Sequence, residues 1–174
     1  MDWRDLASTA VYADITTENE SIWKRIDGVD VEFIGAFLTA HLSLEKYISD
    51  YLRLRYPSLA WDDAKLTFSQ KISLIQNEPA QAPYNEIYIR IKDFNSIRNK
   101  ISHELNYRIT EKEKSKFIDF YVKISKSNQN KPEIDSDNMA DLLKFFVMIA
   151  QSYFASLISH YHYDNIGRKT DNIR

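Results

Sequence analysis

The segment SIRNKISHEL, residues 96–105, carries an arginine, an asparagine and a histidine inside a stretch that otherwise suits a buried helix. Arg98 offers a planar fork of donors that fits phosphate oxygens, and it stays charged in a partly dry cleft. His103 can take or give a proton near neutral pH, and Asn99 can position either group. The three residue types together suit RNA cleavage without a metal, in which a base draws the proton from the ribose 2′-hydroxyl and a cation holds charge on the phosphate.

Arg98 also interrupts an apolar stripe. At 100° per residue, five side chains fall near one line down the helix: Ile87, Ile91, Phe94, Ile101 and Leu105. Arg98 fills the gap in this line. Because desolvating an unpaired charge costs on the order of several kcal/mol, we expect Arg98 to have an acidic partner, an anionic ligand, or both.

An earlier segment shows the same interruption. His41 and Glu45, four positions apart, lie in the middle of a second apolar stripe made by Ile34, Leu38, Ile48 and Leu52. We expect the two helices to pack so that Glu45 faces Arg98 with His41 nearby, as a polar cluster inside a hydrophobic bundle. The alternative is an ion pair that only fixes the register of the two helices.

The position of His103 leaves the geometry of a site open. On a straight helix His103 lies about 140° around from Arg98, whereas Asn99 and His103 share a face. Three arrangements would bring the groups together. The arginine reaches across, or the helix is irregular near Asn95 and Ser96, or the groups meet across a dimer interface.

The composition excludes several classes of function. The chain has 174 residues and no cysteine, so it has no disulfide, no thiolate nucleophile and no sulfur-ligated zinc. Its three glycines form no phosphate-binding motif, and we expect no cofactor and no metal. A net charge of −2 argues against a surface that coats nucleic acid or membrane as a whole.

The fold class predicted is all-α, a single-domain helical bundle with two long antiparallel helices plus shorter ones. We expect one domain over residues 1–163 and a frayed polar tail over 164–174. Asp30 is the expected N-cap of the first long helix, Asp62 or Asp63 that of the next helix, and Thr110 with Glu113 forms a capping box. The predicted helices span about 3–14, 18–25, 31–55, 64–77, 85–107 (one helix or a pair), 110–125 and 136–163.

The last helix is apolar on nearly all sides, so the rest of its domain must cover it. If the domain leaves one face of this helix open, a second subunit is expected to cover that face. We expect it to be too short and too often interrupted by polar residues to span a bilayer. The N-terminus has acidic residues where a secretory signal has basic ones, which predicts a cytoplasmic protein with no membrane partner.

Three segments in order resemble a known family. RNKISH fits the R-N-x-x-x-H form of the RxxxxH motif of HEPN domains. IGAFLTAHLSLEKYI, LTFSQKISLI and FNSIRNKISHELNYRI together resemble a bacterial HEPN-like branch related to mannitol-repressor-like proteins. The resemblance covers roughly Val31 to Ile109.

The resemblance implies a dimeric helical bundle and, in many members, a ribonuclease of toxin–antitoxin or antiphage systems. It makes Arg98 the phosphate binder, His103 the general base or acid and Asn99 the polar residue that follows the arginine. Glu45 resembles the acidic residue that supports the site. Three other residues are expected to support the site: His41, Ser102 and Tyr107. The Tyr107 ring could stack on a base or pack in the core.

Three functions therefore stand as hypotheses. The first is a dimeric HEPN ribonuclease that cuts RNA, with an antitoxin or another protein as a possible partner. The second is a non-catalytic HEPN-like interaction module, and the third is a regulator of the mannitol-repressor kind. No helix-turn-helix with a basic recognition helix is evident in the sequence, so direct DNA recognition has the least support.

Overall fold

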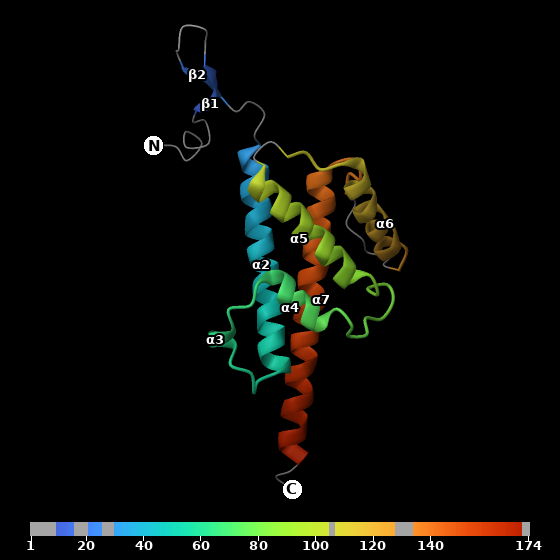
Figure 1. Ribbon diagram of the computed structural model, residues 1–174. Coiled ribbons are helices and arrows are strands. Elements are labelled where there is room, and N and C mark those ends of the chain that lie inside the picture. The colour runs from blue at the N-terminus through green and yellow to red at the C-terminus, as the bar shows by residue number, and fades with distance from the viewer. Residues whose placement is uncertain (1–9, 16–20, 26–29, 105–106, 128–133, 172–174) are drawn as a thin grey trace.

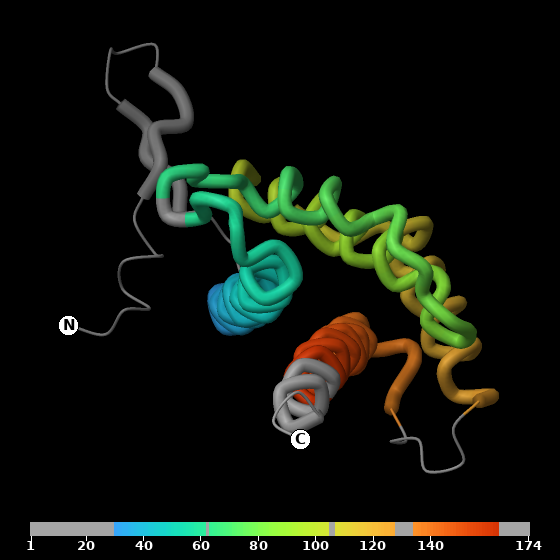
Figure 2. The backbone as a smooth tube through the Cα atoms, turned by 90° about the horizontal axis from the view of Figure 1, so that it is seen from below, coloured from blue at the N-terminus to red at the C-terminus, as the bar shows by residue number. Residues whose placement is uncertain are grey.

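The computed structural model describes residues 10–15, 21–25, 30–104, 107–127 and 134–171, and side chains within 30–163 apart from Asp62. Two long helices, α2 (Val31–Arg55) and α7 (Met139–Asp171), lie side by side and form one layer (Figure 1). The second layer consists of α4 (Phe68–Ile75), α5 (Ile87–His103) and α6 (Glu111–Ser127). This layer covers one face of the α2–α7 pair (Figure 2). The predicted single-domain helical bundle is confirmed.

Local signals set the limits of α2. The Asp30 side chain accepts a hydrogen bond from the Phe33 amide at 2.9 Å, which caps the helix as the sequence predicts. The helix ends at Arg55, two residues before Pro57, because the residue that precedes a proline is disfavoured in helical conformation.

The next helix differs from its prediction. A short turn of helix, α3 (Trp61–Ala64), contains the expected caps Asp62 and Asp63, and it stops where Lys65 adopts a left-handed conformation with φ of 38°. Thr67 instead caps α4 through a capping box with Gln70. The prediction that one helix starts at residue 64 is therefore wrong, because the Thr67 signal is stronger.

The helix α5 is continuous from Ile87 to His103. The alternatives of a helix pair, and of an irregularity near Asn95 and Ser96, are therefore wrong. After it, the predicted capping box of α6 is confirmed. The Thr110 amide donates to Glu113 Oε2 at 2.9 Å, and the Glu113 amide donates to Thr110 Oγ1 at 3.3 Å.

The last helix starts later and runs further than predicted. Asn138 accepts a hydrogen bond from the Ala140 amide at 2.9 Å, and the helix continues through residues 164–171 of the segment expected to fray. Met139–Tyr163 is long and apolar enough to cross a membrane by length and composition, contrary to expectation, and 39% of its most apolar window is buried inside the bundle. Many core helices of soluble proteins share this composition.

The N-terminal segment is not helical where it is described. Ala10–Ile15 (β1) and Ser21–Arg25 (β2) pair as an antiparallel hairpin, so the helices predicted over 3–14 and 18–25 are wrong for these residues. Their β-branched and aromatic residues favour strands, and the stretches are short for helices. Residues 3–9 and 18–20 lie outside the described part of the chain.

The two long helices run in the same direction, not antiparallel as expected (Figure 1). Contacts along the pair agree with this direction. Gln151 of α7 donates to the Ser43 hydroxyl of α2 at 2.9 Å, and further along both helices the ring of Phe154 lies 5.7 Å from that of Tyr51. The chain between them, with α4, α5 and α6, is long enough to return to the starting end.

The centre of the core is an aromatic cluster around Phe146, which is fully buried. Its ring lies 5.5 Å from Phe94 of α5, 5.2 Å from Phe117 and 5.7 Å from Phe120 of α6. One side chain of α7 thus joins three helices. This contact holds the layer that carries residues 87–103 against the long helices.

Replacing Phe146 by alanine should lower the free energy of unfolding by about 3–5 kcal/mol, because it removes a large buried ring and leaves a cavity. Urea denaturation followed by circular dichroism measures the loss. Ile89→Ala, at a position 55% exposed on α5, is the control and should change stability by less than about 0.5 kcal/mol. Equal losses for both variants would contradict the assignment of Phe146 to the centre of the core.

Candidate functional site

Arg98 lies on the edge of the buried face of α5 and is partly buried. The buried face is formed by Ile87, Tyr88, Ile91, Phe94, Ile97 and Ile101, so Ile97 takes the core position beside Arg98. The Nε atom of Arg98 is buried and has no hydrogen-bond partner among the described residues. One terminal nitrogen, Nη1, donates to Asn99 Oδ1 at 3.2 Å. The guanidinium therefore keeps donors free.

The expected pairing of Glu45 with Arg98 is wrong. Glu45 Oε1 accepts instead from Lys71 Nζ of α4 at 2.6 Å. No carboxylate of the described residues lies within 4.0 Å of the Arg98 guanidinium. The helical pattern permitted Arg98 as the partner of Glu45, but α4 brings a second cation closer. The sequence predicts an acidic side chain or an anionic ligand as the partner of Arg98. Since no described carboxylate pairs with it, the anionic ligand is the expectation that remains.

His41 is buried between α2 and α5, with 2% of its surface exposed. Burial lowers its pKa, and the nearby charge of Arg98 lowers it further, against the opposite effects of the Asn95 hydrogen bond and Glu45. The imidazole is thus neutral at pH 7, and its Nε2 lies 3.2 Å from Asn95 Oδ1. Because a carbonyl oxygen only accepts, Nε2 carries the proton and donates.

His103 is exposed at the last position of α5. Since α5 is regular, His103 lies about 140° around the helix and roughly 7.5 Å along it from Arg98. Within one chain the two side chains point to different sides. A reach by the long arginine or a contact between two copies of the chain are the two ways to bring them together.

The remaining supporting residues have structural partners. Ser102 is exposed, and its hydroxyl donates to the carbonyl oxygen of Arg98 at 2.9 Å within the helix. The Tyr107 hydroxyl donates to Glu113 of α6, and its ring packs against the core with Lys100 Nζ 5.3 Å from the ring centroid. Tyr107 therefore joins the end of α5 to the start of α6, and its part in binding a base stays a prediction.

Glu113 is the centre of this junction. Burial alone would raise its pKa, but hydrogen bonds from Lys100, Tyr107 and Thr110 outweigh burial and lower the pKa to about 2 from the ordinary 4.5. A carboxylate whose pKa is lowered in the folded state stabilises the fold above its unfolded pKa. This contribution is lost as the pH falls from about 4.5 to about 2.

Glu113→Gln should therefore lower the free energy of unfolding at pH 7 by about 1 kcal/mol, since solvent at this helix start screens part of the interaction. The difference from the unmodified protein should shrink as the pH falls toward 2. Urea denaturation at several pH values measures it. The control is Glu111→Gln, which removes an exposed charge from the same turn and should lower the free energy of unfolding by less. An effect of Glu113→Gln that does not change with pH would refute the role of the carboxylate.

A polar groove of about 350 Å³ lies between α4 and α5, alongside Asn99. The α5 side of the groove carries Lys92, Asn95, Ser96 and Asn99, at spacings of three, one and three. Neither this groove nor the role of Asn95 was predicted from the sequence. The available signal was the spacing of four between Asn95 and Asn99, which places both amides on one face of a helix.

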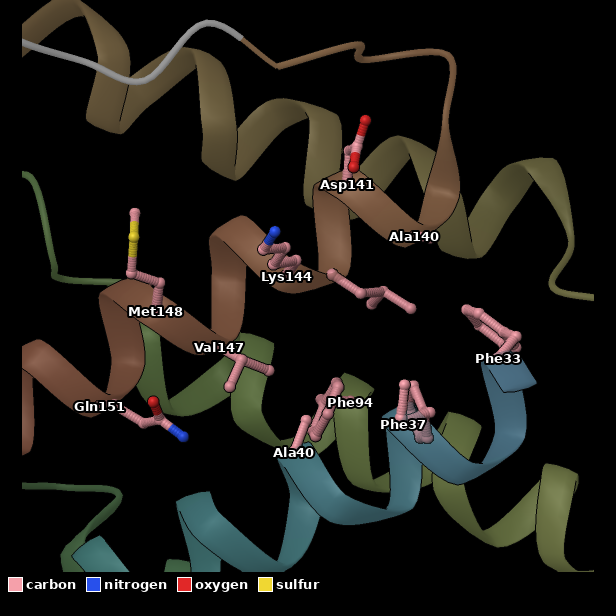
Figure 3. A pocket seen from close by; sticks show the side chains of 12 residues that line it. Phe33, Phe37, Ala40, Phe94, Ala140, Asp141, Lys144, Val147, Met148 and Gln151 are labelled. Carbon is pink, nitrogen blue, oxygen red and sulfur yellow. The ribbon is translucent and has the colours of Figure 1, made fainter. Parts of the chain in front are cut away.

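A second groove, of about 370 Å³ and mostly apolar, lies between the first halves of α2 and α7 (Figure 3). Phe33, Phe37 and Ala40 of α2 line one side of it, and Lys144, Val147 and Met148 of α7 line the other. Asp141 and Lys144 are at its rim on α7, and neither makes an ion pair within the described part of the chain. This groove opens on the α2–α7 layer.

Among the described residues, no group of three or more histidine, aspartate and glutamate side chains is placed to hold a metal ion. No protein-family model, curated protein or solved structure matches the chain. The assignment of function therefore depends on the chemistry and geometry of residues 41–103.

Proposed function

We propose that the protein is a metal-independent endoribonuclease of the HEPN type that acts as a dimer. The observation that carries the proposal is the guanidinium of Arg98, which is partly buried, unpaired with any described carboxylate and located on the same helix as the exposed imidazole of His103. A partly dry cation without a counter-charge suits an anion such as an RNA phosphate.

Each motif residue has one task in this proposal. Arg98 binds the phosphate and stabilises the negative charge that develops on it during attack. His103, exposed and free to meet a substrate, draws the proton from the 2′-hydroxyl or returns one to the leaving oxygen. Asn99 accepts from Arg98 Nη1 at 3.2 Å and holds the guanidinium in place.

The resemblance to HEPN proteins extends the proposal to biological context. A cytoplasmic RNA-cutting protein of this kind fits a toxin or an antiphage defence effector, and an antitoxin or other partner protein would control it. The modest positive charge around α5 agrees with a need for such a partner, because RNA affinity depends on the number of phosphates neutralised.

A non-catalytic HEPN-like module, or a regulator resembling the mannitol repressor, is the second candidate. One observation favours it: the sites of Arg98 and His103 on a regular α5 are about 140° apart within one chain. A protein that only binds partners does not require these two groups to meet.

Incubation of the purified protein with matched RNA and DNA oligonucleotides in the presence of a chelator tests the first proposal. We expect cleavage of RNA alone with a cyclic phosphate product, since DNA lacks the 2′-hydroxyl. His103→Ala and Arg98→Ala should each lower the rate by about 100-fold or more. His160→Ala, at an exposed histidine of α7, is the matched control and should retain the rate.

RNA that stays uncleaved at high concentrations of the unmodified protein would favour the non-catalytic module. Circular dichroism should show that the unmodified protein and both variants are equally folded. Cleavage that persists in His103→Ala would contradict the assigned role of His103. Cleavage of DNA at a similar rate would exclude attack by the 2′-hydroxyl.

We further propose that a second copy of the chain covers the groove between α2 and α7. Because this groove lies on the α2–α7 layer, away from the exposed side of α5, Arg98 in this dimer reaches His103 of its own chain. Asp141, Lys144 and Met148 follow the outer side of α7 at spacings of three and four. The two charges are opposite and unpaired in one copy. Around a two-fold axis, Asp141 of each copy would meet Lys144 of the other, which makes the surface complementary to itself.

Charge reversals test this interface by light scattering after gel filtration. Asp141→Lys alone and Lys144→Asp alone should each weaken the dimer by placing like charges across the axis, whereas the double exchange should restore it. Lys46→Asp, at an exposed position of α2, controls for net charge. A monomer at all concentrations, or a double exchange no better than the single variants, would contradict a dimer through this face.

A further inference from the structure

The groove between α4 and α5 has the features of a built binding site. Its volume of about 350 Å³ falls within the range of roughly 300–1,000 Å³ that small-molecule sites occupy. Phe68 and Ile72 of α4, both buried, give it an apolar wall, while α5 contributes polar side chains. No residue that lines the groove is acidic, and all of them belong to the described part of the chain.

Asn95 presents hydrogen-bond donors to this groove. Its carbonyl oxygen Oδ1 faces inward and accepts from His41 Nε2 at 3.2 Å. The neutral His41 is held by the rings of Phe68 and Phe94, whose centroids lie 4.3 Å and 6.0 Å away. Because Oδ1 contacts His41, the NH₂ group of Asn95 is the part assigned to the groove; among the described residues the hydrogen bond to His41 is the one that the Asn95 side chain makes.

The Asn99 amide also uses its oxygen in a contact within the protein. Its Oδ1 accepts from Arg98 Nη1 at 3.2 Å, and its NH₂ group likewise has no partner in the described chain. Asn95 and Asn99 are one helical turn apart, so their side chains lie on one side of α5. The hydroxyl of Ser96 belongs to the same wall, and it can accept as well as donate.

We infer that this groove is a nucleobase subsite that prefers uridine to adenosine in single-stranded RNA. Two amide donors with a hydroxyl acceptor on the same wall form the complement of the uracil edge, whose two carbonyl oxygens flank an N–H donor. Adenine offers an amino donor and a single acceptor on its edge, and its amino group would meet another donor. The inference rests on the proposed ribonuclease function for the identity of the ligand.

The site also connects base recognition with the reactive phosphate. Asn99 lines the groove and holds Arg98, so a base in the groove places its own backbone beside the guanidinium. The apolar wall made by Phe68 and Ile72 supports the face of the base, which hydrogen bonds alone would not fix. Uridine should therefore lie next to the phosphate that Arg98 binds.

Isotope-edited NMR of the full chain tests the subsite without requiring cleavage. The probes are uridine, uridine 5′-monophosphate, adenosine 5′-monophosphate and inorganic phosphate, with observation of the side-chain NH₂ signals of Asn95 and Asn99. Both uridine compounds should shift these signals, with an affinity at least about tenfold above that of the adenosine nucleotide. Equal affinity for the two nucleotides, or the same shifts from inorganic phosphate, would overturn base recognition.

Two isosteric variants isolate the donors. Asn95→Asp keeps an oxygen for His41 and Asn99→Asp keeps one for Arg98, but each exchanges the NH₂ donor for an acceptor. Each should weaken uridine 5′-monophosphate binding by about tenfold or more. Asn85→Asp, an exposed position outside the groove, adds the same charge and should leave binding unchanged; an equal loss in this control would overturn the role of the amides.

A third set of ligands separates an RNA site from a site for a free nucleotide. A 2′-O-methyl uridine tetramer, which cannot be cleaved through its 2′-oxygen, should bind more tightly than the mononucleotide because its backbone reaches Arg98. A tetramer that binds no better would overturn the RNA subsite. If the protein prefers uridine but leaves RNA intact, the subsite stands and the nuclease proposal is refuted. If it cleaves RNA without a preference for any base, the nuclease proposal stands and the subsite is refuted.

Discussion

The hydrogen bond between His41 and Asn95 is the constraint on which the candidate site depends. His41 is the one charged or polar side chain in the buried core of the described residues, and a buried imidazole needs a partner. Asn95 supplies it from α5. The bond fixes the register of α2 against α5, and it turns the Asn95 amide so that its oxygen faces the core. The orientation of the groove and the placement of Arg98 both follow from this register.

Sequence signals that act within a few residues predicted the structure well. The cap at Asp30, the capping box at Thr110 and the stop before Pro57 depend on neighbours in the chain, and all three are confirmed. Thr67 with Gln70 gave an equally local signal that was overlooked in favour of two aspartates. The hairpin at Ala10–Ile15 was missed because an isolated short stretch carries too few residues to show a period of two or of 3.6.

Contacts between distant segments were harder to predict for a physical reason. A helical wheel shows which side chains face inward, but it does not show which inward groups meet. Glu45 could pair with any cation on a neighbouring helix, and Lys71 of α4 lies closer than Arg98. The wheel also placed Arg98 in the core stripe, whereas the observed helix buries Ile97 and leaves Arg98 at the edge. The expectation of an anionic partner for Arg98 came from its charge, and it stays a prediction.

The shared direction of α2 and α7 has an electrostatic consequence. Peptide dipoles add along each helix, so two neighbouring helices with the same direction place both of their partial positive ends together and repel each other there. Each helix carries an acid in its first turn, Glu32 in α2 and Asp141 in α7, which offsets part of this repulsion. The C-terminal end of α5, with His103, points toward the same end of the molecule (Figure 1). The C-terminal end of α5 carries the opposite partial charge, so it offsets the neighbouring positive ends of α2 and α7, an effect that the formal charges of the sequence do not reveal.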